Sequence, residues 1–235
     1  MVDKQDGFFR KFLEDAANIN NSVTEELREI DIDALIPNPK NFYGIRDIDE
    51  LTGMMVWTKD ITPLTVKDMN NGKYMIVKGH RRWTAAKKAV VEGLMKKRTL
   101  PCKVRLYRNM SLSANGGNKV DLTAEDAELL ELIFDNRGQR KTRTIAEQIA
   151  EIHALTPFAR KMYAANKDSG EWSNFQNYFA NEILGMAQTT LQRKQMLIKC
   201  MPEVIEAVDN NLLSETYAVE LSFRRRNNGN DLRQS

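Results

Sequence analysis

The sequence contains very little cysteine or histidine, which excludes several kinds of site. Among its 235 residues only Cys102 and Cys200 are cysteines, and only His80 and His153 are histidines. The two cysteines are too few and too far apart for a disulfide framework or a zinc site. Neither histidine has a thiol or carboxylate at ligand spacing, so we expect no bound metal. Spacing also reveals no Ser-His-Asp or Cys-His arrangement, so no catalytic residue is predicted.

Long hydrophobic runs are also absent. No stretch of about 18 apolar residues occurs, so we expect no membrane helix. Met1–Asp6 lacks the basic and apolar regions of a secretory signal. With 42% hydrophobic and 29% charged residues and a mean hydropathy of −0.52, the sequence predicts a globular cytoplasmic protein with no membrane partner. Its net charge of +3 is only mildly basic, and nucleic-acid binding would require that charge to be clustered.

The clearest pattern in the first half is a hairpin that leads directly into a helix. Two strand patterns, Leu64–Met69 and Lys73–Val77, flank Asn70-Asn71-Gly72, in which Asn-Gly favours a tight two-residue turn. After Gly79, apolar residues recur at three- and four-residue spacing, which predicts a helix. These residues are Trp83, Ala86, Ala89, Val90 and Leu94. Gly79 therefore lies at a strand-to-helix junction.

The first turn of that helix contains two arginines, which suggests an anion site. Free backbone N–H groups and the positive end of the helix dipole meet at this point, and Arg81 and Arg82 add fixed charge. The dipole alone would favour acidic residues there, so the pair makes sense if a phosphate binds. The alternative is that both arginines are ordinary solvated helix residues, and the sequence leaves the two readings equally open.

Weaker patterns complete a small mixed α/β domain around this segment. Glu29–Asp33 and Leu100–Tyr107 alternate as strands do. Asp47–Glu50 has the spacing of a capping box, for a helix that ends near Asp60. Asn109–Asn118 is rich in Ser, Asn and Gly, which predicts a linker or surface loop.

Beyond this loop no strand pattern is found, and the second half is predicted to be all helical. Thr123 caps a helix with Ala127, Leu130, Ile133 and Phe134 on its apolar face. Further helices are expected at Ile145–Leu155, Asn174–Leu184, Ala187–Met201, Pro202–Asn210 and Leu212–Phe223. The expected domains are a flexible arm at 1–25, the α/β domain at 26–120, a helical domain at 121–223 and a disordered basic tail at 224–235.

A basic cluster follows the first of these helices, at Asp135–Arg143. Gly138 is expected to let the chain turn there. Asn136 and Arg140 could reach the same anion as the arginine pair. Cations near a helix C-terminus are favourable in themselves, so a purely structural role remains open.

A helix-turn-helix is predicted around Gly185. This glycine permits a tight turn after Ala180–Leu184, and a second helix opens at Met186–Leu191. That helix is expected to bury Ala187, Leu191 and Ile198. It displays Gln188, Thr189, Thr190, Gln192, Arg193 and Lys194, residue types that read base edges or hold phosphates in the major groove. An ordinary helical hairpin with a polar outer face is the alternative.

Together these segments resemble the ParB family of chromosome and plasmid partition proteins, over roughly Ile30 to Leu221. Gly79–Ala85 is similar to the family's Gly-Glu-Arg-Arg-x-Arg-Ala box, and Asp135–Arg140 to its Glu-Asn-x-x-Arg segment. Each motif alone is modest, but their order along the chain is fairly specific. The other similar segments are Ile32–Pro39, Ile61–Val66, Ala180–Arg193, Met201–Val204 and Leu213–Ala218.

The resemblance implies a ParB- and sulfiredoxin-like α/β domain followed by an all-helical helix-turn-helix domain. In that family the arginine box and the Asn segment bind the phosphates of CTP with Mg²⁺, and the nucleotide converts a dimer into a clamp on DNA. Carried over to the matched positions, it implies nucleotide contacts from Thr62, Gly79, His80, Arg81, Arg82, Asn136 and Arg140. It implies DNA contacts from Gln188, Thr189, Thr190, Gln192, Arg193 and Lys194.

The same resemblance implies further partners and a location. We expect double-stranded DNA, a second copy of the chain and a ParA-type ATPase as partners, with the protein on the nucleoid or on a plasmid. Weak CTP hydrolysis is left open. The chain departs from the family pattern at His80 and Thr84, which stand where the family has Glu and a third Arg. Thr156–Trp172 is an insertion before the helix-turn-helix.

Three other functions are alternatives to DNA binding with a nucleotide switch. A transcriptional regulator of the same fold would bind DNA without nucleotide. A ParB-type nuclease would need clustered carboxylates holding metal, which the arginine box does not offer. Sulfiredoxin chemistry would need a cysteine in the loop before the helix, and Lys78-Gly79 stand there instead.

Overall fold

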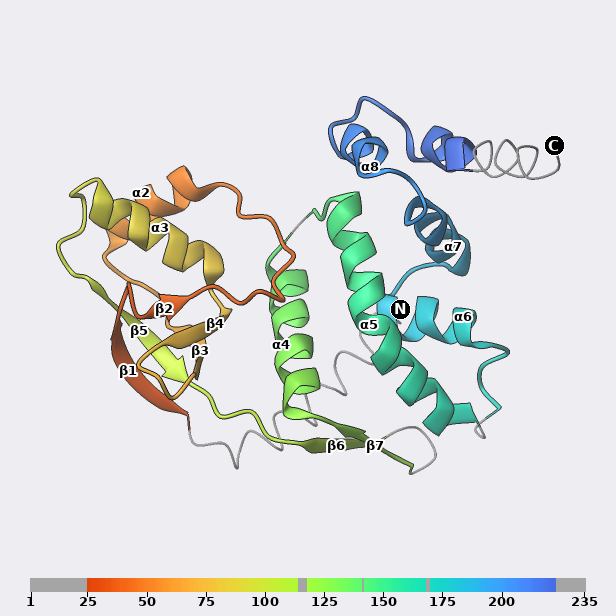
Figure 1. The fold of residues 1–235 in the computed structure, drawn as a ribbon, viewed down its shortest axis with the longest axis horizontal. Coiled ribbons are helices and arrows are strands. Elements are labelled where there is room, and N and C mark those ends of the chain that lie inside the picture. Colours follow the sequence, from red (N-terminus) through yellow and green to blue (C-terminus); the bar gives the residue numbers. More distant parts are fainter. Residues whose placement is uncertain (1–24, 114–117, 141, 168–169, 223–235) are drawn as a thin grey trace, which may run out of the picture. The chain divides into compact units, whose positions relative to one another are not determined.

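The computed structural model describes residues 25–113, 118–140, 142–167 and 170–222, and Figure 1 shows their helices and strands. The chain divides into two compact units, which we describe separately. Among the described residues, 25–112 and 121–139 form the α/β unit, and 113, 118–120, 140, 142–167 and 170–222 form the helical unit. Except for Glu25, the predicted N-terminal arm lies outside the described residues, as does the predicted C-terminal tail.

The α/β unit is built on a five-stranded mixed sheet with the strand order β1-β5-β3-β4-β2. Its pairs β1–β5 and β3–β4 are antiparallel, whereas β3–β5 and β2–β4 are parallel. The predicted alternation and the predicted hairpin are confirmed, with ends shifted by a few residues. The strands are β1 (Glu26–Asp31), β2 (Leu35–Ile36), β3 (Leu64–Asp68), β4 (Tyr74–Lys78) and β5 (Thr99–Val104).

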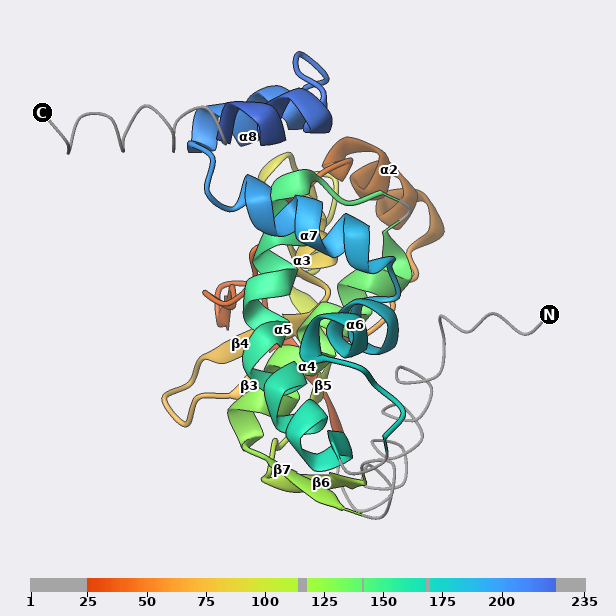
Figure 2. The same cartoon turned by 90° about the vertical axis from the view of Figure 1, so that its right-hand side faces the viewer.

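Helices α2 (Ile48–Thr58) and α3 (His80–Val91) pack together against this sheet, as Figures 1 and 2 show. Their small and apolar residues meet those of the central strands in one core. Because the strands supply β-branched and leucine side chains and α3 supplies alanines, the helix can approach the sheet closely. The fully buried members include Leu64, Val66, Ile76, Ala85, Ala86, Leu100 and Cys102.

The hairpin turn differs from the prediction. Met69–Lys73 separate β3 from β4, and Met69 N–H donates to the Lys73 carbonyl oxygen at 3.0 Å, so this bond closes a loop of three residues rather than two. Asn70 and Gly72 have positive φ angles of 56° and 77°. The Asp68 carboxylate accepts from Asn70 N–H at 2.8 Å, which forms an Asx turn at the start of the loop. The left-handed residues are therefore Asn70 and Gly72 rather than the adjacent pair Asn71-Gly72.

The predicted capping box at the start of α2 is also wrong. Asp47 has a left-handed φ of 54°, and its side chain makes no cap hydrogen bond. Its carboxylate instead lies 3.7 Å from the Arg81 guanidinium. An ionic contact with Arg81 of α3 is therefore found where the spacing suggested a capping hydrogen bond within α2.

Two short strands contradict the predictions of a loop at Asn109–Asn118 and of an all-helical second half. β6 (Met110–Ser113) and β7 (Lys119–Leu122) form a separate two-stranded sheet. Leu112, Val120 and Leu122 are buried, so β7 follows the period-two pattern of a strand. With four residues each, the strands were too short for this alternation to stand out.

Helix α4 (Ala124–Gln139) belongs to the α/β unit and begins as predicted. Thr123 and Asp126 cap it reciprocally, with two N–H to oxygen distances of 3.1 Å. Gly138 does not turn the chain, because it lies inside α4. The predicted domain boundary near residue 120 stays a prediction.

The helical unit contains α5 (Ile145–Asn166), α6 (Phe175–Tyr178), the π-helix η3 (Phe179–Leu184), α7 (Gln188–Leu197) and α8 (Pro202–Asp209), and residues 215–222 are also helical. α5 is twice the predicted length and takes up most of the insertion. Its start carries a complete capping box of Thr144 and Glu147, and Asp209 accepts from Ile145 N–H at 2.5 Å. Across the described ranges, none of the helices has the length and hydropathy needed to cross a bilayer.

Gly79→Ala should destabilise the protein by about 2 kcal/mol or more, because Gly79 has a φ of 97° and an added Cβ would lie 2.9 Å from Leu64 Cγ. Gly53 is the matched control: it lies inside α2, and its added Cβ would meet nothing within 4 Å. Gly53→Ala should therefore stabilise by about 0.5–1 kcal/mol. Urea unfolding measures both, and equal effects of the two variants would contradict the assignment of Gly79 as a steric requirement.

Candidate functional site

No side chain caps the N-terminus of α3. Gly79 occupies the N-cap position. Trp83 N–H makes the first turn's bond to the Gly79 carbonyl, at 3.0 Å, so the preceding N–H groups have no acceptor within the helix. The positive end of the helix dipole acts at the same point. The sequence prediction of a strand-to-helix junction at Gly79 is confirmed.

Arg82 is held by the backbone at this junction. Its Nη1 donates to the Thr62 carbonyl at 2.6 Å and to the Pro63 carbonyl at 2.9 Å. Burial lowers the pKa of Arg82, while the carboxylate of Asp135 acts in the opposite direction. Thr62 therefore meets the arginine through its carbonyl, and Arg82 fixes the loop before β3 against the start of α3.

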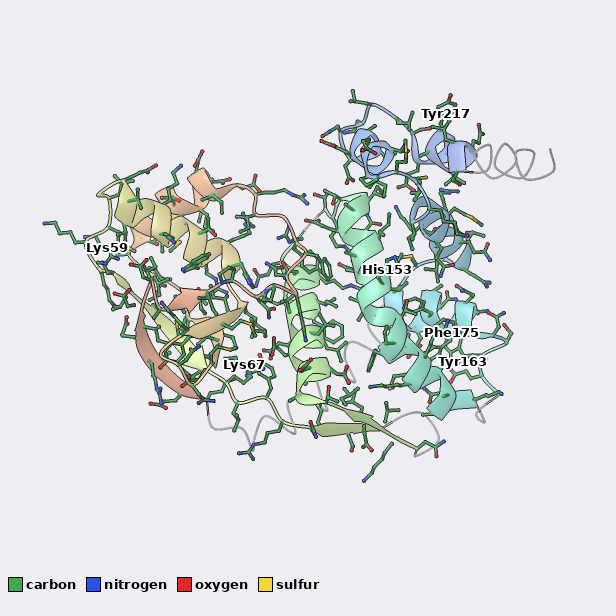
Figure 3. The ribbon with its side chains drawn as sticks, in the orientation of Figure 1. Lys59, Lys67, His153, Tyr163, Phe175 and Tyr217 are labelled. Carbon is green, nitrogen blue, oxygen red and sulfur yellow. The ribbon has the colours of Figure 1, made fainter. Side chains whose placement is uncertain are left out.

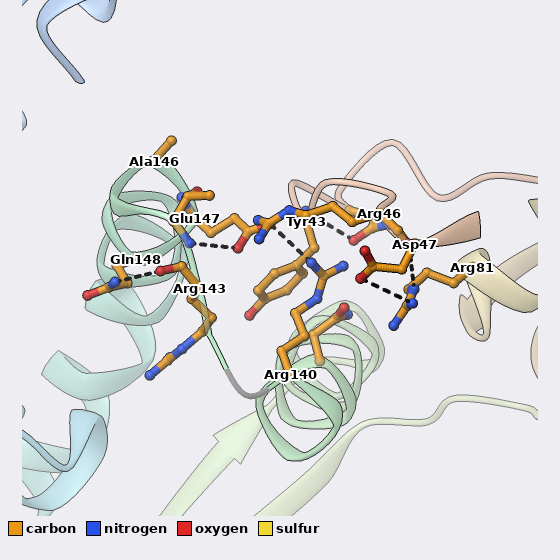
Figure 4. A network of polar contacts seen from close by, with 12 residues as sticks. Tyr43, Arg46, Asp47, Arg81, Arg140, Arg143, Ala146, Glu147 and Gln148 are labelled. Atoms are coloured by element: carbon orange, nitrogen blue, oxygen red, sulfur yellow. Dashed lines mark hydrogen bonds and ion pairs between the residues drawn. The ribbon is translucent and has the colours of Figure 1, made fainter. Parts of the chain in front are cut away.

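Arg81 is held more loosely. Its Nε donates to the Arg46 carbonyl at 2.9 Å, Nη2 lies 3.7 Å from Asp47, and 35% of its side chain is exposed. Figure 4 shows both contacts. One edge of the guanidinium thus rests on the start of α2, and the partial exposure leaves this arginine accessible to an anion from solvent.

His80 points into the protein. It is buried, and its Nε2 accepts from Asn38 N–H at 3.2 Å. Burial lowers the pKa of His80 to about 4, so the ring is neutral at pH 7. The neighbouring Thr84 hydroxyl donates to the His80 carbonyl at 3.0 Å. The predicted nucleotide contact of His80 stays a prediction, and the observed contact joins α3 to the segment after β2.

A buried ionic layer joins α4 to the sheet. Glu128 is 1% exposed, and it accepts from Asn38 Nδ2 and from Lys67 Nζ, both at 2.9 Å. Glu131 lies 2.7 Å from Lys78 and 2.5 Å from Arg105. Asn38 thus contacts both Glu128 and His80, a role that sequence reasoning missed and that only the Asn-Pro turn around it could have suggested.

The pKa values of two carboxylates of α4, Glu131 and Asp135, shift in opposite directions. Burial by itself would raise the pKa of Glu131, but Lys78 and Arg105 together lower it. Burial raises the pKa of Asp135 despite the nearby Lys78 and Arg82. Asn136 follows on the same helix, and its Nδ2 donates to the Leu132 carbonyl at 2.9 Å.

Arg140 belongs to the helical unit. There its Nη1 lies 3.2 Å from Glu147, and the two side chains are only 10% and 4% exposed. Figure 4 shows this pair beside the capping box at the start of α5. The Glu147 carboxylate thus accepts from the N-cap N–H of Thr144 and also pairs with Arg140. The predicted joint role of Arg140 and Asn136 toward one anion stays a prediction.

The tight turn at Gly185 forms as predicted, whereas the helix-turn-helix itself stays a prediction. Gly185 has a φ of 64°, and Met186 N–H donates to the Ala180 carbonyl at 2.9 Å. In α7, Thr189, Gln192 and Arg193 are exposed, whereas Gln188 and Thr190 are half-buried. These five side chains remain candidates for contact with DNA.

Three details of α7 differ from the prediction. Lys194 does not face solvent: it is 4% exposed, and its Nζ lies 2.7 Å from Glu215. Ala187 is exposed rather than buried, and Leu197 takes the fully buried position predicted for Ile198. The turn after Gly185 rotates the helix so that positions 191, 194 and 197 face inward, at helical spacing.

Among the described residues, histidines, cysteines and carboxylates form no group of three that could hold a metal ion. Cys102 is fully buried in the core, and burial raises its pKa to about 12. It therefore remains a thiol. The described part of the chain offers no nuclease-type carboxylate cluster.

Comparison with known proteins identifies relatives for most of the chain. Residues 16–115 match the ParB N-terminal domain family. A nucleoid occlusion protein of Geobacillus kaustophilus is 26% identical over 204 residues, which cover 83% of this chain and 57% of that protein. The probable chromosome-partitioning protein ParB of Vibrio cholerae is 25% identical over 244 residues, covering 88% of this chain and 81% of that protein. The chain thus spans little more than half of the nucleoid occlusion protein.

One solved structure supports the fold. The Pnob8-like ParB-N domain superposes with a TM-score of 0.51 at 12% sequence identity, over 88% of this chain and 83% of that chain. At this identity the likeness concerns the fold alone. The predicted α/β domain followed by a helical region is confirmed, although β7 stands where only helices were predicted, and the helix-turn-helix stays a prediction.

The neutral state of His80 should make stability depend on pH. Above its unfolded-state pKa of about 6.5, the ring is neutral in both states; below it, only the unfolded chain gains a proton until pH approaches the folded-state pKa of about 4. His80 should therefore cost the fold about 2 kcal/mol between pH 6.5 and 5. Urea unfolding at pH 7 and 5 should show a smaller loss for His80→Gln than for wild type. His153→Gln is the control, and equal losses in wild type and His80→Gln would contradict the assignment.

Proposed function

Because residues 16–115 of this chain match the ParB N-terminal domain family, we propose that it is a DNA-binding protein of the partition type. In this proposal the α/β unit binds CTP, and the helical unit binds double-stranded DNA. The nucleotide acts as a switch that converts a homodimer into a clamp. The names of the two curated relatives, one a nucleoid occlusion protein and one a chromosome-partitioning protein, favour a role on bacterial DNA.

The observation that carries the nucleotide half is the uncapped start of α3 at Gly79. A phosphate there would accept from the free N–H groups of the first turn. Arg81 would add a charge-assisted contact, because its guanidinium is partly exposed. Arg82 would act next to it while keeping the Thr62–Pro63 loop in place.

The remaining parts of the nucleotide site are proposed on the family resemblance. His80, Asn136 and Arg140 complete the predicted set of contacts. Mg²⁺ would enter with the nucleotide and be held mainly by its phosphates, since this ion typically keeps several waters and uses few protein ligands. Slow CTP hydrolysis and a ParA-type ATPase partner belong to the same proposal, as does a location on the nucleoid or on a plasmid.

The DNA half is supported by the turn at Gly185 and by the face of α7. The second helix of such a motif enters the major groove with the side chains near its N-terminus. Thr189, Gln192 and Arg193 are exposed on that helix. Arginine and glutamine can each make two hydrogen bonds to one base, which gives sequence discrimination.

A DNA-binding regulator that needs no nucleotide is the second candidate. Two groups of the arginine box are already engaged by the protein: Arg82 by two carbonyls and His80 by Asn38. These contacts stabilise the start of α3 without a ligand. The two candidates differ in whether DNA binding responds to CTP.

Arg81→Ala should weaken CTP binding by about 10- to 100-fold, since a hydrogen bond to a charged group contributes about 1.5–3 kcal/mol. Calorimetry with CTP, ATP, GTP and UTP, each with Mg²⁺, measures it. Arg98→Ala removes an exposed arginine that pairs with Asp33, and it should leave binding unchanged. Equal CTP affinity of Arg81→Ala and wild type would refute the pocket assignment. If wild type binds none of the four nucleotides, the regulator becomes the better description.

Substitutions at the neighbouring residues Arg193 and Lys194 of α7 should affect different properties, DNA affinity in the first case and stability in the second. Arg193→Ala should keep the stability of wild type and reduce DNA affinity, with a loss of about 1–3 kcal/mol if the guanidinium pairs with a base. Lys194→Ala should instead lower the unfolding free energy by about 1.5 kcal/mol, because it removes a charge-assisted hydrogen bond to Glu215, whose carboxylate is 30% exposed and can be hydrated. Urea unfolding and fluorescence anisotropy with duplex DNA measure the two quantities. Unchanged DNA affinity in Arg193→Ala, on every duplex tested, would count against α7 as the reading helix.

A further inference from the structure

Helix α2 has apolar side chains on two opposite sides. Its inner side packs against the core of the α/β unit through Ile48, Leu51 and Met55. On the outer side, Met54 is 56% exposed and Trp57 is 85% exposed. Tryptophan is highly buried on average in folded proteins, and a surface helix ordinarily has one apolar face and one polar face. The outer side of α2 is therefore typical of an interaction surface.

Four exposed residues on the outer side follow one line along the helix. They are Glu50, Gly53, Met54 and Trp57, which we call the α2 outer stripe. Steps of three, one and three residues place them on the same face. This spacing is the same in both directions, and its midpoint falls between Gly53 and Met54. A Cβ added at Gly53 would meet nothing within 4 Å, so the middle of the stripe has room for a side chain of a neighbouring molecule.

The symmetric spacing allows two copies of the stripe to pair with each other. When two α2 helices run antiparallel about a two-fold axis through the midpoint, each Met54 faces Gly53 of the second copy. Each Trp57 then faces Glu50 of the second copy. The methionine fills the space above the glycine, and the indole ring lies over the glutamate side chain. Such a contact uses the same surface patch on both molecules, as two-fold symmetric dimers do.

The two ends of α2 carry complementary charges. Glu50 lies in the first turn of the helix, and Lys59, which Figure 3 labels, is its C-cap residue. Both are exposed, and neither forms an ion pair with another of the described residues. In the antiparallel arrangement, Glu50 of each copy approaches Lys59 of the other. A parallel arrangement would instead place Glu50 beside Glu50, so the charges favour a second copy that runs antiparallel.

We propose that the α2 outer stripe is a contact between two copies of this chain, with their α2 helices antiparallel. The contact rests on the homodimer of the proposed function and identifies a surface for it, and it requires neither CTP nor DNA. Covering Trp57 buries about 150–250 Å² per copy, whereas a stable interface needs about 800 Å² per partner. The stripe by itself therefore gives weak association, which increases with protein concentration and adds to any other contact between the two copies.

The test is sedimentation equilibrium of the full chain, without nucleotide or DNA, at protein concentrations from about 1 μM to 1 mM. Wild type should dimerise, and Trp57→Ala should raise the dimer dissociation constant by about 30-fold or more, as loss of a central aromatic residue does at interfaces. Leu212→Ala is the matched control, because it truncates a side chain that is 79% exposed on the helical unit. It should leave the dissociation constant unchanged.

Charge reversal distinguishes a second copy from any other partner. Glu50→Lys and Lys59→Glu should each weaken dimerisation by about tenfold, because each places like charges together at both ends of the contact. An equimolar mixture of the two variants should regain the wild-type affinity, since a chain carrying Glu50→Lys then pairs with one carrying Lys59→Glu. If the mixture associates as weakly as the separate variants, the antiparallel contact is wrong.

The remaining outcomes separate this contact from the rest of the proposed function. Urea unfolding at low protein concentration should give Trp57→Ala the stability of wild type, and a large loss would mean that another part of the same chain covers the tryptophan, which refutes the proposal. If wild type dimerises and all three stripe variants keep its affinity, the homodimer uses a different surface. If wild type stays monomeric, the stripe proposal fails, while calorimetry with CTP and anisotropy with duplex DNA still decide the nucleotide and DNA halves.

Discussion

The close approach of β4 and α3 at Gly79 is the constraint on which the α/β unit depends. Its φ of 97° turns the chain from strand to helix within one residue, and the missing Cβ leaves room for Leu64 and for the guanidinium of Arg82. That guanidinium then binds the carbonyls of Thr62 and Pro63. One residue without a side chain thereby joins the start of α3 to the start of β3. The same geometry leaves the N-terminus of α3 without a side-chain cap.

The two arginines that follow this glycine are adjacent in sequence but have different environments. Successive helical residues point about 100° apart, so Arg82 turns toward the β3 loop and Arg81 toward the start of α2. Arg82 donates to the carbonyls of Thr62 and Pro63, and Arg81 donates to the Arg46 carbonyl and lies near the exposed carboxylate of Asp47. His80 turns inward to Asn38. Without a ligand, His80 and Arg82 thus bind backbone groups of the protein, and Arg81 is the more exposed of the two arginines.

Several charged side chains of the helical unit are buried, and each of them forms an ion pair. Acidic side chains of α5 lie inside, paired with Arg140 and Arg143, and Lys194 of α7 is buried against Glu215. Because burying a charge is tolerable only with a partner, these pairs fix the helices in register.

The sequence by itself determined the elements whose signals are local. Asn-Gly with flanking alternation predicted the β3–β4 hairpin, Gly79 the strand-to-helix junction, Thr123 the start of α4, and Gly185 the turn before α7, because each depends on φ preferences or spacing within a few residues. The tertiary structure alone decided which side chains are available. Asp47 lies near Arg81 and does not cap α2 as predicted. Lys194 is buried against Glu215, although it was predicted to face DNA. β7 forms from four residues whose pattern is weak. Such outcomes depend on partners distant in sequence, whose burial and charge no local pattern records.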